Sequence, residues 1–339
     1  MKNCIYFLLL LAAGLFASCD ADFDPNDDWR EQMMVYCLLD QDDDTTYVRV
    51  EKCFLGQGNA LEFAKNKDSV YYASDELDVK IYAYNRWDTS QLEKVFDFNY
   101  SEVYKAYGEF YSDTECPVYY CVTKNELTTN HYYKLVIRNN KTGKTVTSSS
   151  YLIMDYSIQM NNMWFSGREM DENKRLEIKW TNFNGTADNQ NIIPKQYQIN
   201  VRLNYLKEGA IRSIDIPVGK KLNNNTVTST TLSSYTTIGT IVSGIMLQLQ
   251  NEHDLRLYEA QPFEIRISAC GLSLFDYVSI NNSTQNVLNY QPVYSNIEGG
   301  FGIFAARRQN IKRVFSGKEL DTDLLLAIGE NVPAFGSGY

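Results

Sequence analysis

The sequence predicts a mainly β protein built from two antiparallel β-sandwich domains of immunoglobulin or fibronectin type, with a short helix near the C-terminal end. Three observations support this fold class. Short segments alternate apolar and polar residues with a period of two. Clusters of Gly, Asn and Asp separate these segments. The chain also carries 25 tyrosines in 339 residues, a residue type suited to half-buried strand positions.

The first predicted domain covers residues 33–150. In segment 77–84, Leu, Val, Ile and Ala alternate with Asp, Lys and Tyr, which places one face inward. Segments 33–39 and 45–53 flank an Asp-rich turn at 40–44. Segments 131–138 and 144–150 flank a hairpin loop in which Gly143 is free to adopt a positive φ. A further strand is expected at 117–123, and residues 56–76 predict a long connection with a helical turn.

The second predicted domain covers residues 151–308. Segment 196–205 places alternate apolar residues on one face, and segment 263–269 repeats the pattern. Residues 181–195 and 219–240 are rich in Asn, Thr and Ser, so we expect long loops or ragged edge strands there. The spacing predicts a helix over 272–284, with Leu274, Phe275 and Val278 on one side. A final strand is expected at 301–306, followed by a tail at 309–339 that contains a short helix at 317–329.

The N-terminus reads as a signal peptide over residues 1–18 that leads to a lipid-attachment cysteine, Cys19. Lys2 precedes an apolar run, and the small residues Ala17 and Ser18 precede the cysteine. An ordinary secretory signal followed by a coincidental cysteine is the alternative. No other segment approaches the roughly 20 apolar residues of a membrane helix, so we expect the lipid to be the only anchor.

An acidic tether is predicted at residues 19–32, since few of its side chains are suited to a core. Acidic residues directly after a lipidated cysteine resemble a signal for export to the cell surface, although a plain soluble spacer would have the same composition. The formal net charge of the chain is −10, with no cluster of Lys or Arg. This balance argues against binding to nucleic acid. The acidic residues of the tether are Asp20, Asp22, Asp24, Asp27 and Asp28.

No motif in the chain predicts catalysis or a cofactor. The two histidines, His131 and His253, have no partner at the spacing of a zinc site. The chain lacks a Gly-x-Ser-x-Gly elbow, a glycine-rich phosphate loop and a dinucleotide fingerprint. Paired glycosidase carboxylates would be neighbours in space rather than in sequence, and nothing selects a pair. We therefore expect no enzyme activity and no cofactor.

One local pattern resembles a metal loop. Asp40, Asp42 and Asp44 alternate, and Glu51 stands at the twelfth position counted from Asp40, as in calcium loops. Thr45 stands where such a loop needs Gly, and the following residues predict a strand. A solvated hairpin turn is the favoured interpretation, and calcium is the weaker hypothesis.

The cysteines leave their pairing open. An odd number remains after Cys4 and Cys19, so at least one is unpaired within the chain. Cys37 and Cys53 flank a predicted hairpin, and Cys116 and Cys121 are close in sequence. Buried free thiols are the favoured state for most of the five, which are Cys37, Cys53, Cys116, Cys121 and Cys270.

The most distinctive string, at residues 292–304, reads PVYSNIEGGFGIF. Its three glycines predict a backbone that bulges or packs closely against another segment inside a core. This block, the aromatic helix before it and the first strand after an acidic tether resemble the Bacteroidota lipoproteins grouped as domain of unknown function 4249. The resemblance covers roughly residues 19–308; the acidic first loop and the tail from Arg307 depart from it. It implies an outer-membrane lipoprotein of β-sandwich modules, often associated with TonB-dependent transporters, and no activity.

These features lead to two functional hypotheses. The first is a lipid-anchored outer-membrane protein at the cell surface that acts beside a TonB-dependent transporter in nutrient uptake, by binding substrate or the transporter. Its ligand class, whether small molecule, peptide or glycan, stays open. The alternative is a structural adhesin or fimbrial-type subunit. Paired tyrosines at 71–72, 119–120 and 132–133 would present one ring of each pair outward if they lie in strands.

Overall fold

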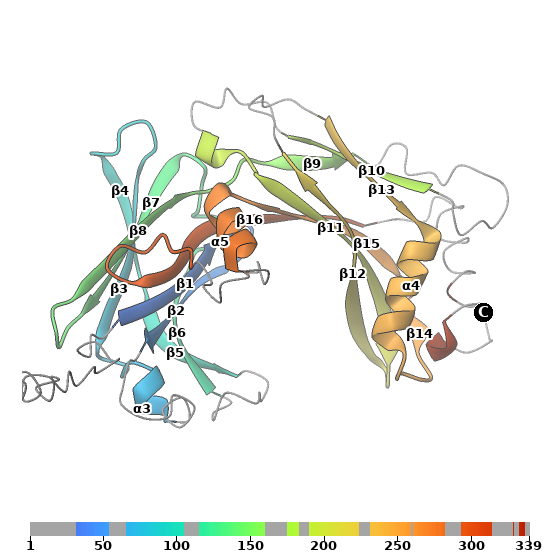
Figure 1. The fold of residues 1–339 in the computed structure, drawn as a ribbon, viewed down its shortest axis with the longest axis horizontal. Helices are drawn as coiled ribbons and strands as arrows, with labels where there is room; N and C mark the ends of the chain where they lie inside the picture. Colours follow the sequence, from blue (N-terminus) through green and yellow to red (C-terminus); the bar gives the residue numbers. More distant parts are fainter. Residues whose placement is uncertain are drawn as a thin grey trace, which may run out of the picture.

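The computed structural model describes residues 32–53, 66–104, 115–159, 175–182, 190–223, 231–258, 260–281, 293–313, 328 and 332–335. Strands form 58% of this part, with only three α-helices, so the prediction of a mainly β protein with several antiparallel sheets is confirmed. In Figure 1 the ribbon forms an arch, with the early strands at the left and the later strands at the right. The signal peptide, Cys19, the tether up to residue 31 and nearly all of the predicted helix at 317–329 lie outside the described residues.

The N-terminal half contains two sheets with alternating burial. Their inward faces belong to one core that includes Val35, Ile81 and Ile137. The turn at residues 40–44 and the loop with Gly143, at φ +73°, are hairpin connections as predicted. The short helix α3 (Lys67–Val70) fits the predicted helical turn. One sheet contains β1 (Gln32–Leu39), β2 (Thr45–Cys53), β6 (Glu115–Val122) and β5 (Asn99–Tyr104); the other contains β4 (Leu92–Asp97), β3 (Leu77–Asn85), β7 (His131–Asn139) and β8 (Thr145–Tyr151).

The C-terminal half places a three-stranded sheet against the other end of the large sheet. The ring of Trp180 lies 5.2 Å from that of Tyr197, and the ring of Tyr156 lies 5.3 Å from it, which joins the two layers. The large sheet continues through β12 (Ala210–Leu222), β11 (Gln196–Lys207), β15 (Phe263–Cys270) and β16 (Phe301–Arg313), with β14 (Arg256–Leu257) beside β11; the smaller sheet has the order β13 (Thr231–Thr237), β10 (Arg175–Asn182), β9 (Tyr156–Gln159).

Strand β16 connects the two halves. Its residues Phe301–Ala306 pair in parallel with β1, and its later residues pair in an antiparallel manner with β15. The expectation of purely antiparallel sheets is therefore wrong at the β1–β16 pair. A parallel pair needs a long connection, and here nearly the whole described chain separates the two strands. The large sheet consequently runs through both halves without a break (Figure 1).

The glycine-rich block lets β16 approach β1 closely. Gly302 has φ +113°, and a Cβ atom at this position would lie 2.0 Å from the carbonyl oxygen of Val35. A Cβ atom at Gly300 would lie 2.7 Å from the carbonyl oxygen of Met33. The side chain of Asn296 pairs with the backbone of Phe304, accepting from its N–H at 2.9 Å and donating to its oxygen at 2.7 Å. The prediction of close packing inside a core is confirmed.

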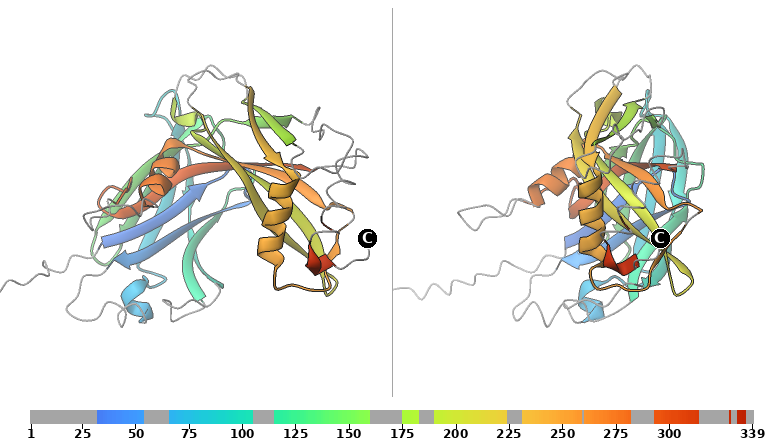
Figure 2. Two further views of the ribbon diagram at one scale, coloured as in Figure 1. Left: turned by 45° about the vertical axis from the view of Figure 1, so that its right-hand side comes forward. Right: turned by 90° about the vertical axis from the view of Figure 1, so that its right-hand side faces the viewer.

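Two helices flank the C-terminal half. The predicted helix near 272–284 is present as α5 (Leu272–Asn281). Helix α4 (Ile238–Leu249) begins where loops or edge strands were expected, so that prediction is wrong from residue 238 onward. Thr237 caps α4: its hydroxyl oxygen accepts a hydrogen bond from the N–H of Thr240. The apolar side of α4 faces the core. Figure 2 shows α4 beside the short turn η2 (Pro333–Phe335), whose Phe335 packs on Tyr205 of β11.

Candidate functional site

A cleft of about 480 Å³ lies where the two halves meet. Its apolar wall is one side of α5, formed by Leu274, Phe275 and Val278, the three residues that the sequence placed together. Helix α5 is held over the junction because the N–H of Gly271 donates to the oxygen of Ala306 at 3.2 Å. The helix also reaches β1: burial, with Tyr277 close by, raises the pKa of Tyr36 to about 12.

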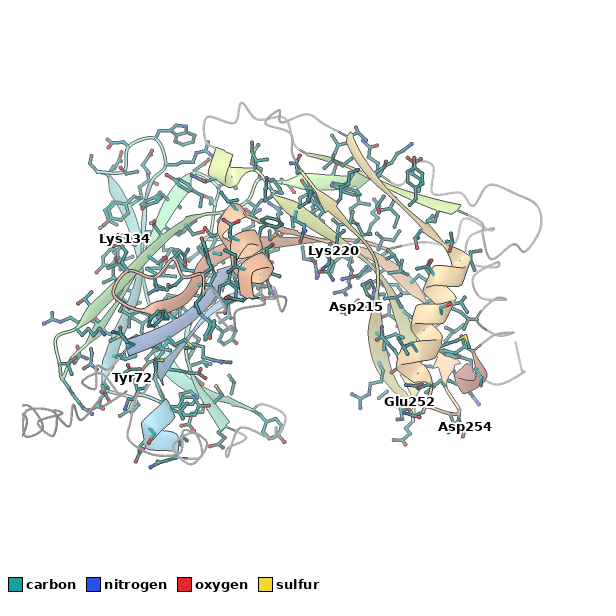
Figure 3. All side chains as sticks on the ribbon, in the orientation of Figure 1. Tyr72, Lys134, Asp215, Lys220, Glu252 and Asp254 are labelled. Atoms are coloured by element: carbon teal, nitrogen blue, oxygen red, sulfur yellow. The ribbon has the colours of Figure 1, made fainter. Side chains whose placement is uncertain are left out.

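The floor of the cleft is the polar face of the large sheet. Successive side chains of a strand point to opposite faces, so β11 buries Tyr197, Ile199 and Val201 and turns Gln196 and Gln198 to the cleft. Gln198 lies beside Ser268 of β15 and Lys220 of β12 in the strand registers. In Figure 3, Lys220 and Asp215 lie on the side of the arch that faces the N-terminal half.

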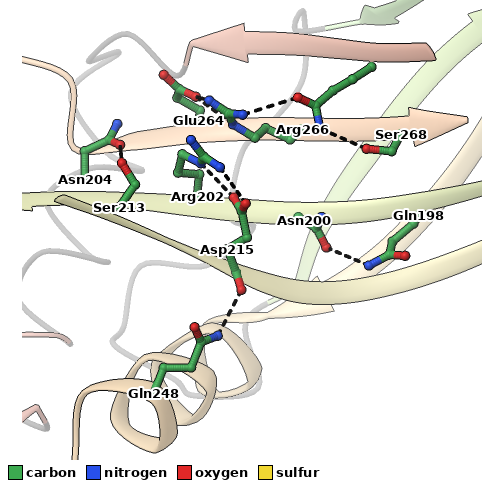
Figure 4. Close-up of polar contacts among 11 residues, drawn as sticks. Gln198, Asn200, Arg202, Asn204, Ser213, Asp215, Gln248, Glu264, Arg266 and Ser268 are labelled. Atoms are coloured by element: carbon green, nitrogen blue, oxygen red, sulfur yellow. Dashed lines mark hydrogen bonds and ion pairs between the residues drawn. The ribbon is translucent and has the colours of Figure 1, made fainter. Parts of the chain in front are cut away.

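The polar face continues beyond the cleft as a network of paired side chains (Figure 4). Arg202 donates to both carboxylate oxygens of Asp215, at 2.8 and 2.6 Å, and this contact lowers the pKa of Asp215. Arg266 donates from two of its nitrogens to a single carboxylate oxygen of Glu264, at 2.9 and 2.6 Å. It also donates to Gln309 at 3.3 Å, which in turn donates to Ser268. These contacts hold the floor side chains in fixed positions.

The Asp-rich turn forms the opposite rim of the cleft. Asp40 is only 4% exposed, and burial raises its pKa to about 6. Arg307 of β16 lies 3.5 Å from Asp40 and 3.2 Å from Asp43. Arg308 is 7% exposed and lies between Asp42, at 3.3 Å, and Asp155, at 3.1 Å. The turn is thus a hairpin, as expected, but it packs on two arginines of β16, and Asp40 is buried rather than solvated.

The structure does not gather the calcium candidates around one centre. Asp40 and Asp42 face the arginines of β16, whereas Asp44 pairs with Lys124 at 2.9 Å. Glu51 lies further along β2 and pairs with Arg49 at 3.0 Å. Among the described residues, no group of three or more His, Cys, Asp or Glu side chains is arranged to hold a metal ion.

The histidines lie apart from the cleft. His131 contacts Glu93 at 2.7 Å and the hydroxyl of Tyr133 at 3.3 Å, at the start of β7. His253 is exposed in the loop that follows α4. Neither histidine lines the cleft.

The five described cysteines are all unpaired. Cys53 lies opposite Gln32, and Cys37 lies opposite Val48, so the two do not face each other across the β1–β2 hairpin. Cys116 and Cys121 are five residues apart on β6, which places them on opposite faces of the strand. The geometry excludes both pairings that the spacing left open. Only Cys270 borders the cleft.

A second surface contains tyrosines on the outer face of the four-stranded sheet. Tyr132 is partly exposed beside Tyr151, with ring centroids 5.0 Å apart, and Tyr82 lies 6.5 Å from Tyr84. Lys134, labelled in Figure 3, lies on this face at the outer side of the arch.

The tyrosine pairs follow strand alternation only where they lie in strands. Tyr133 and Tyr119 are buried, and the next ring of each pair, Tyr132 and Tyr120, is partly exposed. Tyr71 and Tyr72 are both buried, because they follow α3 outside a regular strand.

The resemblance described from the sequence is carried by its motifs alone, chiefly the glycine-rich block at residues 292–304. Among the described residues, no helix is long and apolar enough to cross a membrane. A scan against protein-family models found no match to this chain, and a search of curated proteins found none either.

Proposed function

We propose that this chain is a lipoprotein, anchored to the outer membrane through Cys19, that acts as a binding component beside a TonB-dependent transporter in nutrient uptake. The described residues stand outside the cell in this proposal, on the tether at 19–32. The two halves are immunoglobulin-like or fibronectin-like sandwiches of the family grouped as domain of unknown function 4249, and the protein has no catalytic role.

The cleft under α5 is the observation that carries this proposal. It combines an apolar wall, amide and hydroxyl groups on its floor and charged groups at its rim. Binding sites are typically concave, with apolar walls and a few converging polar groups that fix orientation. Both halves contribute to the cleft, so a ligand would contact the N-terminal turn and the C-terminal sheet together. This arrangement favours binding over a purely structural role.

Co-purification tests the proposed partnership. The tagged full chain is extracted from outer membranes in mild detergent, and the proteins that accompany it are identified by mass spectrometry. We expect a TonB-dependent barrel in amounts close to stoichiometric. A Cys19→Ala chain has no thiol to carry the lipid, so it should not reach the outer membrane and should no longer co-purify with the barrel. Repeated recovery of the lipidated chain without any such barrel would overturn the proposed partnership.

Assembly into a surface fibre is the second candidate, and the edges of the large sheet favour it. β5 and β12 are the terminal strands of that sheet. They expose Val103, Tyr104 and Ile211, and Tyr104 is 78% exposed. An edge strand with exposed apolar side chains can pair with another chain. Heat-sensitive ladders on gels of unboiled samples would favour this candidate, and a single monomer band would count against it.

A further inference from the structure

Resting on the proposed role of the cleft as a binding site, we propose that its ligand is a short peptide with free termini. The peptide lies extended across the strands of the large sheet. Its amine faces the Asp-rich turn and its carboxylate faces Lys220.

The charges of the cleft are separated between its two ends. At the end near the N-terminal half, Asp40, Asp42 and Asp43 line the cleft with Arg307 and Arg308. Three carboxylates against two guanidinium groups leave this end negative. Asp155 contacts Arg308 as well and strengthens the excess. A cationic amine is therefore favoured here over a carboxylate.

The opposite end of the cleft is positive. Lys220 is exposed on β12, borders the cleft and has no ion-pair partner among the described residues. The nearest carboxylate of that strand, Asp215, is already bound at two points by Arg202. A ligand carboxylate would find a free ammonium group at Lys220.

The distance between the two ends sets the length of the ligand. The sheet order is β12-β11-β15-β16, and the turn lies just beyond β16. Three strand spacings of about 4.8 Å separate β12 from β16, or about 14 Å. An extended peptide rises about 3.3 Å per residue, so roughly four to six residues span the ends.

The middle of the cleft suits a peptide better than a glycan. The side chains of Gln198, Ser268 and Gln309 offer donors and acceptors to peptide groups on the floor. Leu274 and Val278 on α5 offer an apolar wall to peptide side chains. A neutral sugar could stack on the ring of Phe275 but would leave the separated charges without a counterpart.

Equilibrium dialysis of the full chain tests the ligand class. The probe is a mixture of synthetic peptides of about two to eight residues, random in sequence, with free termini, and mass spectrometry reads what the protein retains. We expect retention to peak near four to six residues. Acetylation of the amines or amidation of the carboxylates should reduce it. Retention without length preference, or unchanged by blocking both termini, overturns the proposal. No retention of peptides also overturns it, as does retention of a neutral oligosaccharide mixture in their place.

Two matched pairs of variants locate the termini. Lys220→Gln should lower the affinity for the retained peptides by about 3- to 10-fold. Lys221→Gln, which removes the same charge from the opposite face of β12, should leave affinity unchanged. Asp43→Asn should weaken binding to a similar degree. Asp44→Asn, beside Lys124 and away from the cleft, should not.

Blocked peptides then complete a double-mutant cycle. An amidated peptide should be insensitive to Lys220→Gln, and an acetylated one to Asp43→Asn. The reversed pattern would show that the peptide runs the other way and would overturn the proposed orientation. These binding measurements need no transporter, so their failure is separate from failure of the co-purification.

Discussion

Gly302 is the residue whose replacement the fold should tolerate least. Gly302→Ala would place a methyl group 2.0 Å from the carbonyl oxygen of Val35, at a φ of +113°. We expect a loss of at least about 3 kcal/mol in the free energy of unfolding, measured by urea denaturation. Gly143→Ala is the control, because its φ is also positive but nothing lies within 4 Å of the added Cβ. That variant should lose only about 1–2 kcal/mol. Equal losses would contradict the role given to the close approach of β16 to β1.

Asp40 should make stability depend on pH. Burial raises its pKa from 3.8 to about 6 in the folded chain, so the neutral form is favoured by folding. The stability that Asp40 contributes is fully present below the pKa of its carboxyl in the unfolded chain and is lost as the pH rises through about 6. The free energy of unfolding falls by about 3 kcal/mol at most over this range. Asp40→Asn should remove this loss. The free energy of unfolding of the Asp40→Asn variant, relative to that of the parent chain, should therefore rise between about pH 4 and pH 7.5 in urea titrations.

The control for Asp40 is Asp44→Asn, on the same turn. Asp44 is exposed and pairs with Lys124 at the surface. Its replacement should change the free energy of unfolding by less than about 0.5 kcal/mol at neutral pH. A pH profile for Asp40→Asn that runs parallel to that of the parent chain would contradict the burial of the Asp40 carboxyl.

At the scale of elements, Tyr156 fixes β9 to the large sheet. Its buried hydroxyl lies 2.5 Å from the oxygen of Ile267, and it accepts from the N–H of Asn310 at 3.2 Å. Tyr156→Phe would leave both backbone groups without this partner and should cost about 1–3 kcal/mol in unfolding free energy.

The comparison is Tyr119→Phe. The hydroxyl of Tyr119 is also buried but has no hydrogen-bond partner among the described residues. Its removal should change the unfolding free energy by less than about 0.5 kcal/mol. A larger loss for Tyr119→Phe than for Tyr156→Phe in urea denaturation would contradict this account of the β9 contact.

Sequence periodicity predicted the strands well and α4 poorly, for physical reasons. Tyr197, Ile199 and Val201 alternate with polar residues because one face of β11 is core and the other is the open floor. Helix α4 contains Gly239, Gly244 and several β-branched residues, which are weak helix formers. It forms because its apolar side packs on the sheet; a Cβ atom at Gly244 would lie 2.4 Å from Ile216. Such a tertiary contact leaves no local signal.

The candidate site was only partly predictable. The apolar side of α5 was visible in the sequence, and so was the cluster of acids at 40–44. Their meeting depends on the parallel pairing of β1 with β16, strands from opposite ends of the described chain. The alternation of apolar and polar residues within a strand does not indicate which distant strand it pairs with. The sequence therefore does not predict that Arg307 and Arg308 contact the acidic turn; they stand where the resemblance to the family ends.

At the scale of the whole molecule, the shared strand should make the two halves unfold together. β16 pairs with both, and Arg308 links Asp42 of the first hairpin to Asp155 beside β9. We expect a single calorimetric transition with equal calorimetric and van't Hoff enthalpies. Arg308→Met should move the whole transition to lower temperature, by the loss of about 2 kcal/mol of ion pairing. Arg212→Met, on the exposed part of β12, should leave it in place. Two resolved transitions, of which Arg308→Met shifts only one, would mean that the halves fold independently and that the cleft between them is not held rigid by the fold.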